Sequence, residues 1–149
     1  MTKLQQVVTQ TETAISNSAT VQDIYAAFGA GDAPRVLSHL SEDVDWEYGA
    51  GPSDVPWLQP RAGKTGAAAF LSSLADFRIE KFEPKAFLES GDLVVVLLDV
   101  EATVGSTGLR ISEQDQVHLW HFGEDGKVAR FRHRADTLQH QRACKPASV

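Results

Sequence analysis

The chain has 149 residues, 42% of them hydrophobic, and a formal net charge of -6 at pH 7. This length and composition fit one domain with a core of its own. The acidic balance, with no Lys/Arg run longer than a pair, argues against nucleic acid or an anionic membrane surface as a partner.

The cysteine content and the hydropathy pattern exclude further classes of protein. Cys144 is the single cysteine, so an internal disulfide and a thiolate-rich metal site are excluded. No stretch approaches the roughly 20 apolar residues that a membrane span needs, and the N-terminus lacks a signal-peptide pattern. The sequence therefore predicts a cytoplasmic protein without a membrane partner.

The first part of the chain predicts a tail and two helices. Residues 1–19 are rich in Thr, Gln and Ser, which predicts a flexible N-terminal tail. From Thr20, a candidate N-cap, apolar residues follow helical spacing as far as Gly31. Asp32 is then expected to cap a second helix, with Pro34 in its first turn.

The middle of the chain predicts a strand, a long loop and a third helix. Val44, Trp46 and Tyr48 alternate with acidic residues, which indicates a strand with its aromatic side chains inward. Residues 49–66 are rich in Gly and Pro, and a loop of that length is typical of a lid or a pocket rim. A helix over residues 65–76 follows, and then come two short strands, residues 79–82 and 85–89.

The last third of the chain predicts an antiparallel meander. Strand-like runs at residues 93–104, 109–122 and 127–135 are joined by the Gly-bounded turns 105–108 and 123–126. After the meander, Asp136 and Thr137 can cap a short final helix, and residues 143–149 are expected to fray.

The third strand of the meander indicates which face is buried. Arg130, Arg132 and Arg134 share one side and favour water, so Phe131 and His133 are predicted to face the interior. If both turns are even in length, pairing carries a largely polar row inward, namely Leu97, Asp99, Glu101, Gln114, Gln116, His118 and Trp120. Buried polar groups need partners, so this row either satisfies itself or lines a cavity that holds water or ligand.

Histidine and carboxylates in an apolar cavity suit general acid–base catalysis. We expect Asp99 or Glu101 to orient His133 or a water, and His133 or His118 to move the proton. Two alternatives stay open: His133 as a structural hydrogen-bonding group, and Glu101 as a solvated residue at the end of its strand. The expected ligand-binding wall is Trp46, Tyr48, Trp57, Phe70, Leu74, Leu97, Gln114, Gln116, Trp120 and Phe131.

No metal or cofactor is expected. The same histidines and carboxylates could supply metal ligands, but no short motif sets their spacing. The Gly-rich segment 29–31 follows a helix, whereas a nucleotide-binding fold needs it after a strand.

The element order resembles the nuclear transport factor 2-like superfamily, and within it the SnoaL-like, ketosteroid-isomerase-related branch. The residues that carry the resemblance lie at 21–32, 40–46, 118–122, 125–128 and 131–132. It implies an α+β fold over residues 20–142, a cone-shaped barrel of a strongly curved, mixed, mainly antiparallel sheet. Three helices from the N-terminal half are expected to pack on its concave face, and a homodimer is expected.

The resemblance also bears on activity, although this fold hosts isomerases, cyclases, dehydratases, hydrolases and non-catalytic binders. The helix Tyr and the base Asp of ketosteroid isomerase fall on Ile24 and near Tyr48. The catalytic positions of limonene epoxide hydrolase fall on Asp99, Glu101 and His133, which are all ionisable. The expectation is a small cofactor-independent enzyme that transfers protons on a hydrophobic small molecule; the alternatives are a non-catalytic binder of an apolar ligand and a dimeric adaptor with a filled barrel.

Overall fold

The computed structural model describes residues 16–46 and 53–145. Tyr48 and most of the predicted tail lie outside these ranges. The elements in chain order are α2 (Asn17–Gly29), α3 (Ala33–Ser38), β1 (Leu40–Trp46), β2 (Arg61–Ala62), α4 (Gly63–Ser73), the 3-10 turn η1 (Leu74–Asp76), β3 (Phe77–Ser90), β4 (Leu93–Val104), β5 (Arg110–Phe122), β6 (Val128–Arg134) and α5 (Thr137–Ala143).

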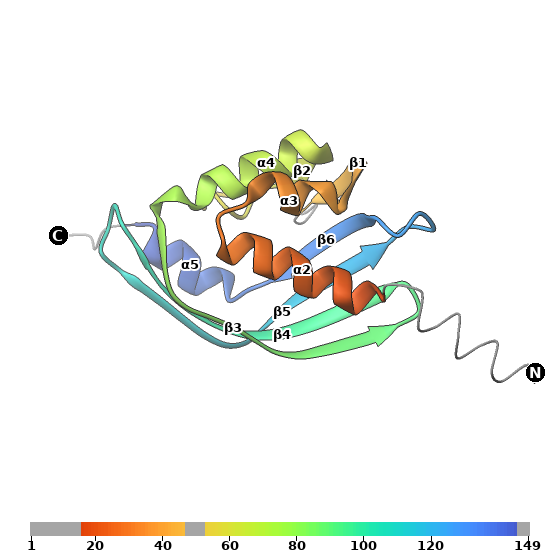
Figure 1. Cartoon of the computed structure of the whole chain (residues 1–149). Helices are drawn as coiled ribbons and strands as arrows, with labels where there is room; N and C mark the ends of the chain where they lie inside the picture. Colours follow the sequence, from red (N-terminus) through yellow and green to blue (C-terminus); the bar gives the residue numbers. More distant parts are fainter. Residues whose placement is uncertain (1–15, 47–52, 146–149) are drawn as a thin grey trace, which may run out of the picture.

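One mixed sheet carries the fold, with strand order β2-β1-β6-β5-β4-β3. The pairing of β1 with β6 is parallel, and the other pairings are antiparallel. Helices α2, α3 and α4 cover one face of the curved sheet, and the long strands β3, β4 and β5 sweep beneath them (Figure 1). The predicted α+β architecture is confirmed, with a sheet that stays open rather than closing into a barrel.

Side-chain caps define where several helices begin. The Ser16 hydroxyl accepts the Ala19 N–H, so α2 starts earlier than the predicted cap at Thr20. Asp32 and Asp136 cap α3 and α5 as predicted. Among the described helices, none combines the length and apolar character needed to cross a bilayer.

The two short strands predicted between residues 79 and 89 are one strand. β3 runs unbroken through Pro84, which sits at a register irregularity against β4. Because β3 is the last strand in the sheet order, Pro84 removes no hydrogen bond that an interior strand would need.

An ion-pair cluster joins the first two helices. Asp23 of α2 accepts hydrogen bonds from the Arg35 guanidinium and from His39 Nε2, the latter at 2.6 Å. These bonds, chiefly the one from Arg35, lower the pKa of Asp23 to about 2. These bonds hold α2 and α3 together above the sheet.

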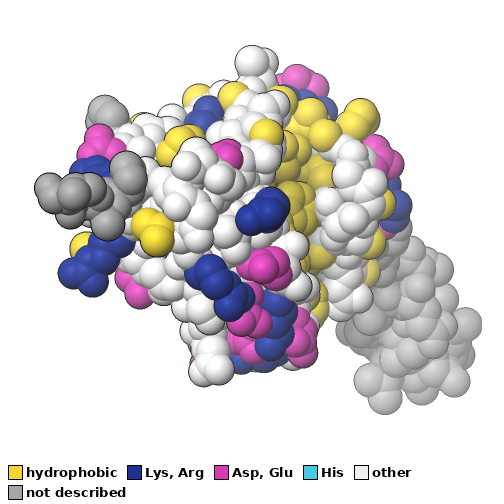
Figure 2. Space-filling view, turned by 90° about the vertical axis from the view of Figure 1, so that its left-hand side faces the viewer, with side chains coloured by type: hydrophobic (Ala, Val, Ile, Leu, Met, Phe, Trp, Pro, Cys, Tyr) yellow, Lys and Arg dark blue, Asp and Glu magenta, His cyan; other side chains and the backbone are white. Residues whose placement is uncertain are grey.

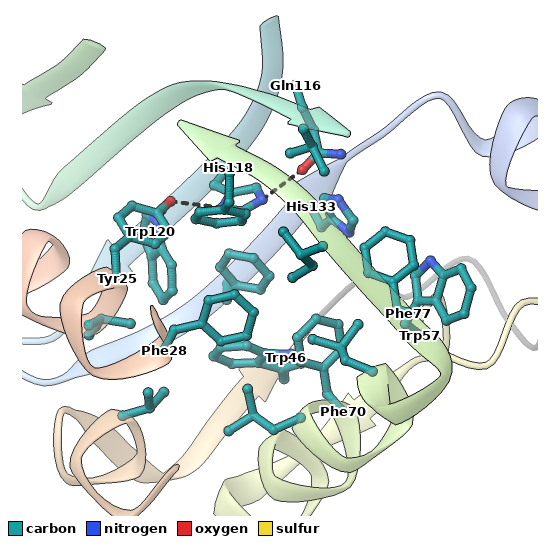
Figure 3. Close-up of a pocket in the computed structure, with 18 of the residues that line it drawn as sticks. Tyr25, Phe28, Trp46, Trp57, Phe70, Phe77, Gln116, His118, Trp120 and His133 are labelled. Carbon is teal, nitrogen blue, oxygen red and sulfur yellow. Dashed lines mark hydrogen bonds between the residues drawn. The ribbon is translucent and has the colours of Figure 1, made fainter. Parts of the chain in front are cut away.

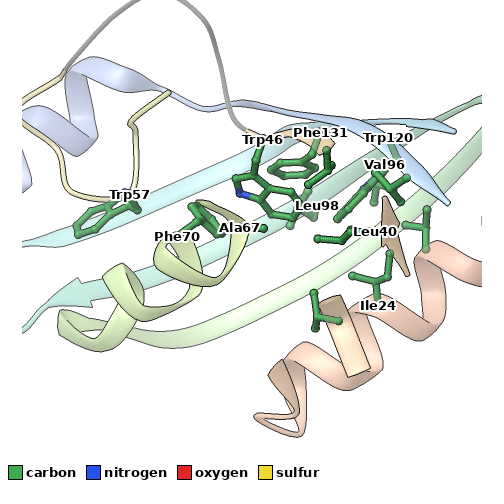
Figure 4. Packing of buried hydrophobic residues seen from close by; sticks show 14 of the residues in the cluster. Ile24, Leu40, Trp46, Trp57, Ala67, Phe70, Val96, Leu98, Trp120 and Phe131 are labelled. Carbon is green, nitrogen blue, oxygen red and sulfur yellow. The ribbon is translucent and has the colours of Figure 1, made fainter. Parts of the chain in front are cut away.

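The core lies between the helices and the concave face of the sheet. β4 alternates regularly, and Val94, Val96 and Leu98 are fully buried on its concave side. They pack with Trp46, Phe70, Trp120 and other large side chains from β1, α4 and β5 (Figure 4). Each fully buried side chain of this size stabilises the fold by roughly 1.5–3 kcal/mol.

The register between β4 and β5 differs from the predicted one because β5 contains a β-bulge. Near the turn, Val100 pairs with Glu113, as the even-turn rule requires. Beyond it, two residues of β5 oppose Asp99 alone, and Asp115 takes a φ of 59°, after which Leu98 pairs with Gln116. The one-residue shift means that the concave face holds the even-numbered residues of β4, not the predicted odd-numbered ones.

The second hairpin departs from prediction in a way that keeps the face unchanged. Pairing was expected to set His118 opposite Phe131, but His118 lies opposite His133. The difference is two residues, so both side chains still point to the concave side. The result is that two histidines become direct cross-strand neighbours.

Candidate functional site

A cavity of about 80 Å³ lies between the concave sheet face and helices α2 and α4 (Figure 3). Its wall is mostly aromatic and aliphatic, and it includes all three tryptophans of the chain. The volume suits several waters or a small organic molecule. The polar side chains in its wall are Tyr25, Gln116, His118, His133 and His140.

A surface groove between α2 and β3 leads to this cavity. Tyr25, Phe28, Ile79 and Phe82 line both spaces. Ile79 is 36% exposed, so it marks the boundary between the interior and solvent. On the face drawn in Figure 2, hydrophobic side chains gather in a hollowed strip beside charged surface.

A chain of hydrogen bonds begins at the α2 end of the cavity. Trp120 Nε1 donates to the Tyr25 hydroxyl over 3.1 Å. The same hydroxyl lies 2.7 Å from His118 Nδ1, and His118 Nε2 lies 3.1 Å from Gln116 Oε1. Figure 3 shows this line of side chains, which joins α2 to the floor of the cavity.

The chain continues to the C-terminal helix. Gln116 Nε2 donates to one oxygen of Glu113. The other Glu113 oxygen accepts the Asp136 backbone N–H and lies 3.2 Å from His140 Nε2. His140 Nδ1 in turn accepts from Trp57 Nε1 at 2.8 Å. Glu113 is therefore a buried carboxylate with donors on both oxygens.

Burial and these contacts set the protonation states. Burial, with a smaller contribution from His133, holds the pKa of His118 well below its ordinary value, so the ring is neutral. Burial raises the pKa of Tyr25, which keeps the hydroxyl protonated. Burial also disfavours ionised Glu113, but hydrogen bonds from His140 and other donors outweigh it and lower the pKa of Glu113.

Three histidine rings lie in sequence along the cavity. The ring centroids of His118 and His133 are 5.1 Å apart, with the rings nearly perpendicular. His133 and His140 are 6.0 Å apart. The wall thus holds several imidazoles within reach of one small molecule.

Most of the predicted wall and both predicted histidines lie at the cavity. The shared feature is a side chain on the concave face or on an element packed against it, and the residues are Trp46, Trp57, Phe70, Leu74, Gln116, His118, Trp120, Phe131 and His133. Their roles in binding or catalysis stay predictions. Tyr48 lies outside the described residues.

The structure does not bring the predicted carboxylates to the histidines. The bulge at Asp115 turns Asp99 and Glu101 to the outer face of the sheet, where Asp99 lies 2.8 Å from Lys85 Nζ. The hydrogen bond from Lys85 lowers the pKa of Asp99. Glu101 lies 3.3 Å from Arg110 Nη2.

Leu97 and Gln114 were also expected in the wall, and neither lines the cavity. Leu97 follows the odd-numbered side of β4, which faces outward. Gln114 sits in the bulge and is exposed. Both corrections have the same cause, a count of alternate residues carried across a bulge.

Sequence reasoning missed Tyr25, Glu113 and His140. The helical spacing includes Tyr25 on the apolar face, but the resemblance set the helix Tyr of ketosteroid isomerase at Ile24, one residue earlier, so Tyr25 received no role at the site. Glu113 could have been found from Ile111, since a buried aliphatic residue two positions away indicates the phase of the strand before the bulge. No sequence signal singles out His140.

The histidines and carboxylates of the site do not form a metal-binding cluster. Within the described ranges, no group of three or more His, Cys, Asp or Glu side chains is arranged to hold a metal ion.

Comparisons with known proteins agree with this architecture. A family model described as a SnoaL-like domain matches residues 21–131. An NTF2-like protein of unknown function from Burkholderia pseudomallei is 30% identical, with 88% of this chain and 99% of that chain covered and a TM-score of 0.75. TerC, co-crystallised with polyporic acid, is 26% identical, with 86% and 97% covered and a TM-score of 0.71.

A Delta 5-3-ketosteroid isomerase from a Mycobacterium species shares the fold alone. It is 19% identical, with 84% of this chain and 97% of that chain covered and a TM-score of 0.66. No curated protein matches the sequence significantly.

Proposed function

Because the chain belongs to the family of SnoaL-like domains, we propose that it is a cofactor-independent enzyme that transfers protons on a small, largely apolar molecule in this cavity. The observation that carries the proposal is the pair formed by the Tyr25 hydroxyl and His118 Nδ1, a donor and an acceptor 2.7 Å apart in an apolar wall. General acid–base catalysis needs such a pair within reach of the substrate.

The two groups have complementary roles in this proposal. When a substrate carbonyl oxygen takes the hydrogen bond of the Tyr25 hydroxyl, the lone pair of His118 Nδ1 is released. Nδ1 then accepts a proton from the adjacent carbon: the C–H bond breaks, an N–H bond forms, and the electron pair moves to the oxygen as an enolate. Return of the proton to another carbon completes an isomerisation.

The cavity wall supports a substrate that is aromatic or cyclic and carries at least one oxygen. Aromatic side chains dominate the wall, and they favour flat, apolar ligands. Trp46 is 3% exposed, and its Nε1 has no hydrogen-bond partner among the described residues. A ligand oxygen would satisfy that donor. The co-crystallisation of TerC with polyporic acid is compatible with this class.

A second function, non-catalytic binding of an apolar ligand, is favoured by one observation. Both ring nitrogens of His118 are already hydrogen-bonded inside the protein, to Tyr25 and Gln116. Because the hydrogen bonds of this chain are complete without a substrate, a structural role, which is to orient the aromatic side chains of the wall, is sufficient to explain it.

Exchange of substrate protons with solvent separates the two functions. A panel of small cyclic enones and aryl ketones is incubated with the protein in D₂O, and the loss of C–H signals next to the carbonyl is followed by ¹H NMR. We expect exchange with the wild type and a loss of roughly 100-fold or more with Tyr25→Phe or His118→Gln. Glu101→Gln, which changes a carboxylate on the outer face, is the matched control.

Two results would contradict the enzyme. Saturable binding of a panel compound without any exchange would leave the non-catalytic binder. Exchange that survives both cavity variants would place the chemistry at other residues.

The outer face of the sheet supports a homodimer. Val95, Leu97, Val117 and Leu119 are only partly buried there, and they form neighbouring pairs across β4 and β5. An apolar strip on a sheet face is typical of an interface with a second copy. Size exclusion with light scattering should give twice the chain mass of 16.2 kDa, and a monomer at micromolar concentration would refute this.

A further inference from the structure

We propose that Glu113 is a positioning residue that, through Gln116, fixes which nitrogen of His118 carries the proton. The proton is held on Nε2, so that Nδ1 keeps its lone pair toward Tyr25. The consequence for catalysis rests on the proposed function, whereas the tautomer itself is a property of the protein alone.

The direction of each hydrogen bond follows from groups that can act in only one way. An indole N–H only donates, so Trp120 requires the Tyr25 oxygen to accept. Its hydrogen can point to His118 Nδ1, 2.7 Å away, but the second lone pair of the oxygen could equally accept from a protonated Nδ1, so this end of the chain does not set the tautomer by itself. At the α4 and α5 side, Trp57 likewise requires His140 Nδ1 to accept. His140 therefore carries its proton on Nε2, which faces Glu113.

The Glu113 carboxylate decides the orientation of the Gln116 amide. An ionised carboxylate only accepts, so Gln116 must turn its NH₂ group toward Glu113 and its carbonyl oxygen toward His118. The carbonyl oxygen only accepts, so His118 Nε2 must donate. A neutral imidazole has a single N–H, which leaves Nδ1 as the acceptor.

The fold holds this carboxylate firmly. Glu113 is 8% exposed, and the bulge at Asp115 brings it onto the same face as Gln116. The Asp136 backbone N–H and His140 bind its second oxygen. Since Asp136 caps α5 and His140 lies within it, the C-terminal helix takes part in setting the state of a residue at the other end of the cavity.

The state of His118 can be read directly by NMR. In ¹⁵N-histidine-labelled protein, long-range ¹H–¹⁵N spectra distinguish a protonated ring nitrogen from an unprotonated one, and the His118→Gln spectrum assigns the signals among the five histidines. At neutral pH we expect a single His118 form with the proton on Nε2. A wild-type spectrum with the proton on Nδ1 would overturn the proposal.

Glu113→Gln tests the link to the carboxylate. A glutamine at this position can donate, so the Gln116 amide is free to turn and offer its NH₂ group to His118. The tautomer ratio should shift roughly 10-fold or more toward the Nδ1–H form. Glu113→Asp, which keeps the charge, should retain the Nε2–H form, and Glu101→Gln should leave it unchanged. If folded Glu113→Gln gave the same His118 signals as the wild-type protein, the role of Glu113 would be refuted.

Gln116→Met is the second variant, for the case in which Glu113→Gln does not fold. It removes the acceptor of His118 Nε2 but keeps the bonds between Glu113 and α5, and both tautomers should then appear. A single Nε2–H form in Gln116→Met would contradict the proposal. These spectra need no substrate, so their outcome is separate from the exchange test of the proposed enzyme.

Discussion

Glu113 and Asp99 are carboxylates on paired strands, separated by one bulge, and their surroundings are opposite. Glu113 lies on the concave face, buried, with donors from α5 and from Gln116. Asp99 lies on the outer face beside Lys85 and Lys81. The phase of one strand, set by a single residue with positive φ, therefore decides which carboxylate joins the buried hydrogen-bond chain that reaches the cavity wall.

The two faces should respond very differently to a charge, and this gives the largest expected effect. Val96 is fully buried on the concave face, whereas its neighbour Leu97 is partly exposed on the outer face. Val96→Asp should cost more than about 4 kcal/mol and leave little folded protein. Leu97→Asp should keep the native circular dichroism spectrum. Similar loss of folding in both variants would contradict the assignment of faces.

The carboxylates themselves provide the next test. Glu113→Ala leaves the donors of His140, Gln116 and the Asp136 backbone without an acceptor, and it should lower the free energy of unfolding by about 3–5 kcal/mol. Asp99→Ala removes a surface ion pair and should change stability little. Urea unfolding of the two variants measures the contrast. A larger loss for Asp99→Ala would contradict the placement of Glu113 in the buried hydrogen-bond chain and of Asp99 at the surface.

A buried and a surface hydroxyl group, those of Tyr25 and Ser106, should differ in the same way, with smaller effects on stability. Tyr25→Phe leaves Trp120 Nε1 and His118 Nδ1 without their partner, at a cost of about 1–3 kcal/mol. Ser106→Ala removes a hydroxyl that donates to the Asp76 carboxylate at the surface, and it should stay within about 0.5 kcal/mol of wild type. Thermal unfolding suffices, and equal effects would show that the Tyr25 hydroxyl is not held as described.

The pH dependence of stability gives the smallest effect. The folded state lowers the pKa of His118, so below about pH 6.5 the unfolded chain binds a proton that folded His118 does not. Stability should therefore fall as the pH decreases, with up to about 1.4 kcal/mol per pH unit from this group. Urea midpoints from pH 7 to pH 5 should decrease less in His118→Gln than in wild type.

His121→Gln is the control on the outer face for this series. His121 is less buried and its pKa is lowered less strongly, chiefly by partial burial. Its substitution should change the slope less than His118→Gln does. An unchanged slope in His118→Gln would indicate that His118 is not held neutral by the fold.

The sequence predicted the three strands of the meander, both turns, the inward face of β6 and that of β5 beyond the bulge. Those features depend on local alternation, on glycines and on the arginines of β6, all of which act within a few residues. The phase of β4 relative to β5 depends on Asp115 adopting φ 59°. An Asp adopts that conformation too seldom for sequence alone to require it.

The candidate site, like the sheet, could be predicted only where the alternation of residues along a strand holds. His118, His133 and the tryptophans were found because they lie beyond the bulge or on other elements, where alternation holds. Glu113 was missed because it precedes the bulge. His140 and Trp57 meet only when α5 folds back against the loop before β2, a contact between residues 83 positions apart that no local pattern encodes.

The most direct test of the cavity as the working site is a crystal structure of the protein with a cyclic enone or aryl ketone that quenches its tryptophan fluorescence. The ligand is expected in the cavity, with its oxygen about 2.5–3.0 Å from the Tyr25 hydroxyl. A ligand on the outer face of the sheet, or one in the cavity with its oxygen directed away from Tyr25, would contradict it.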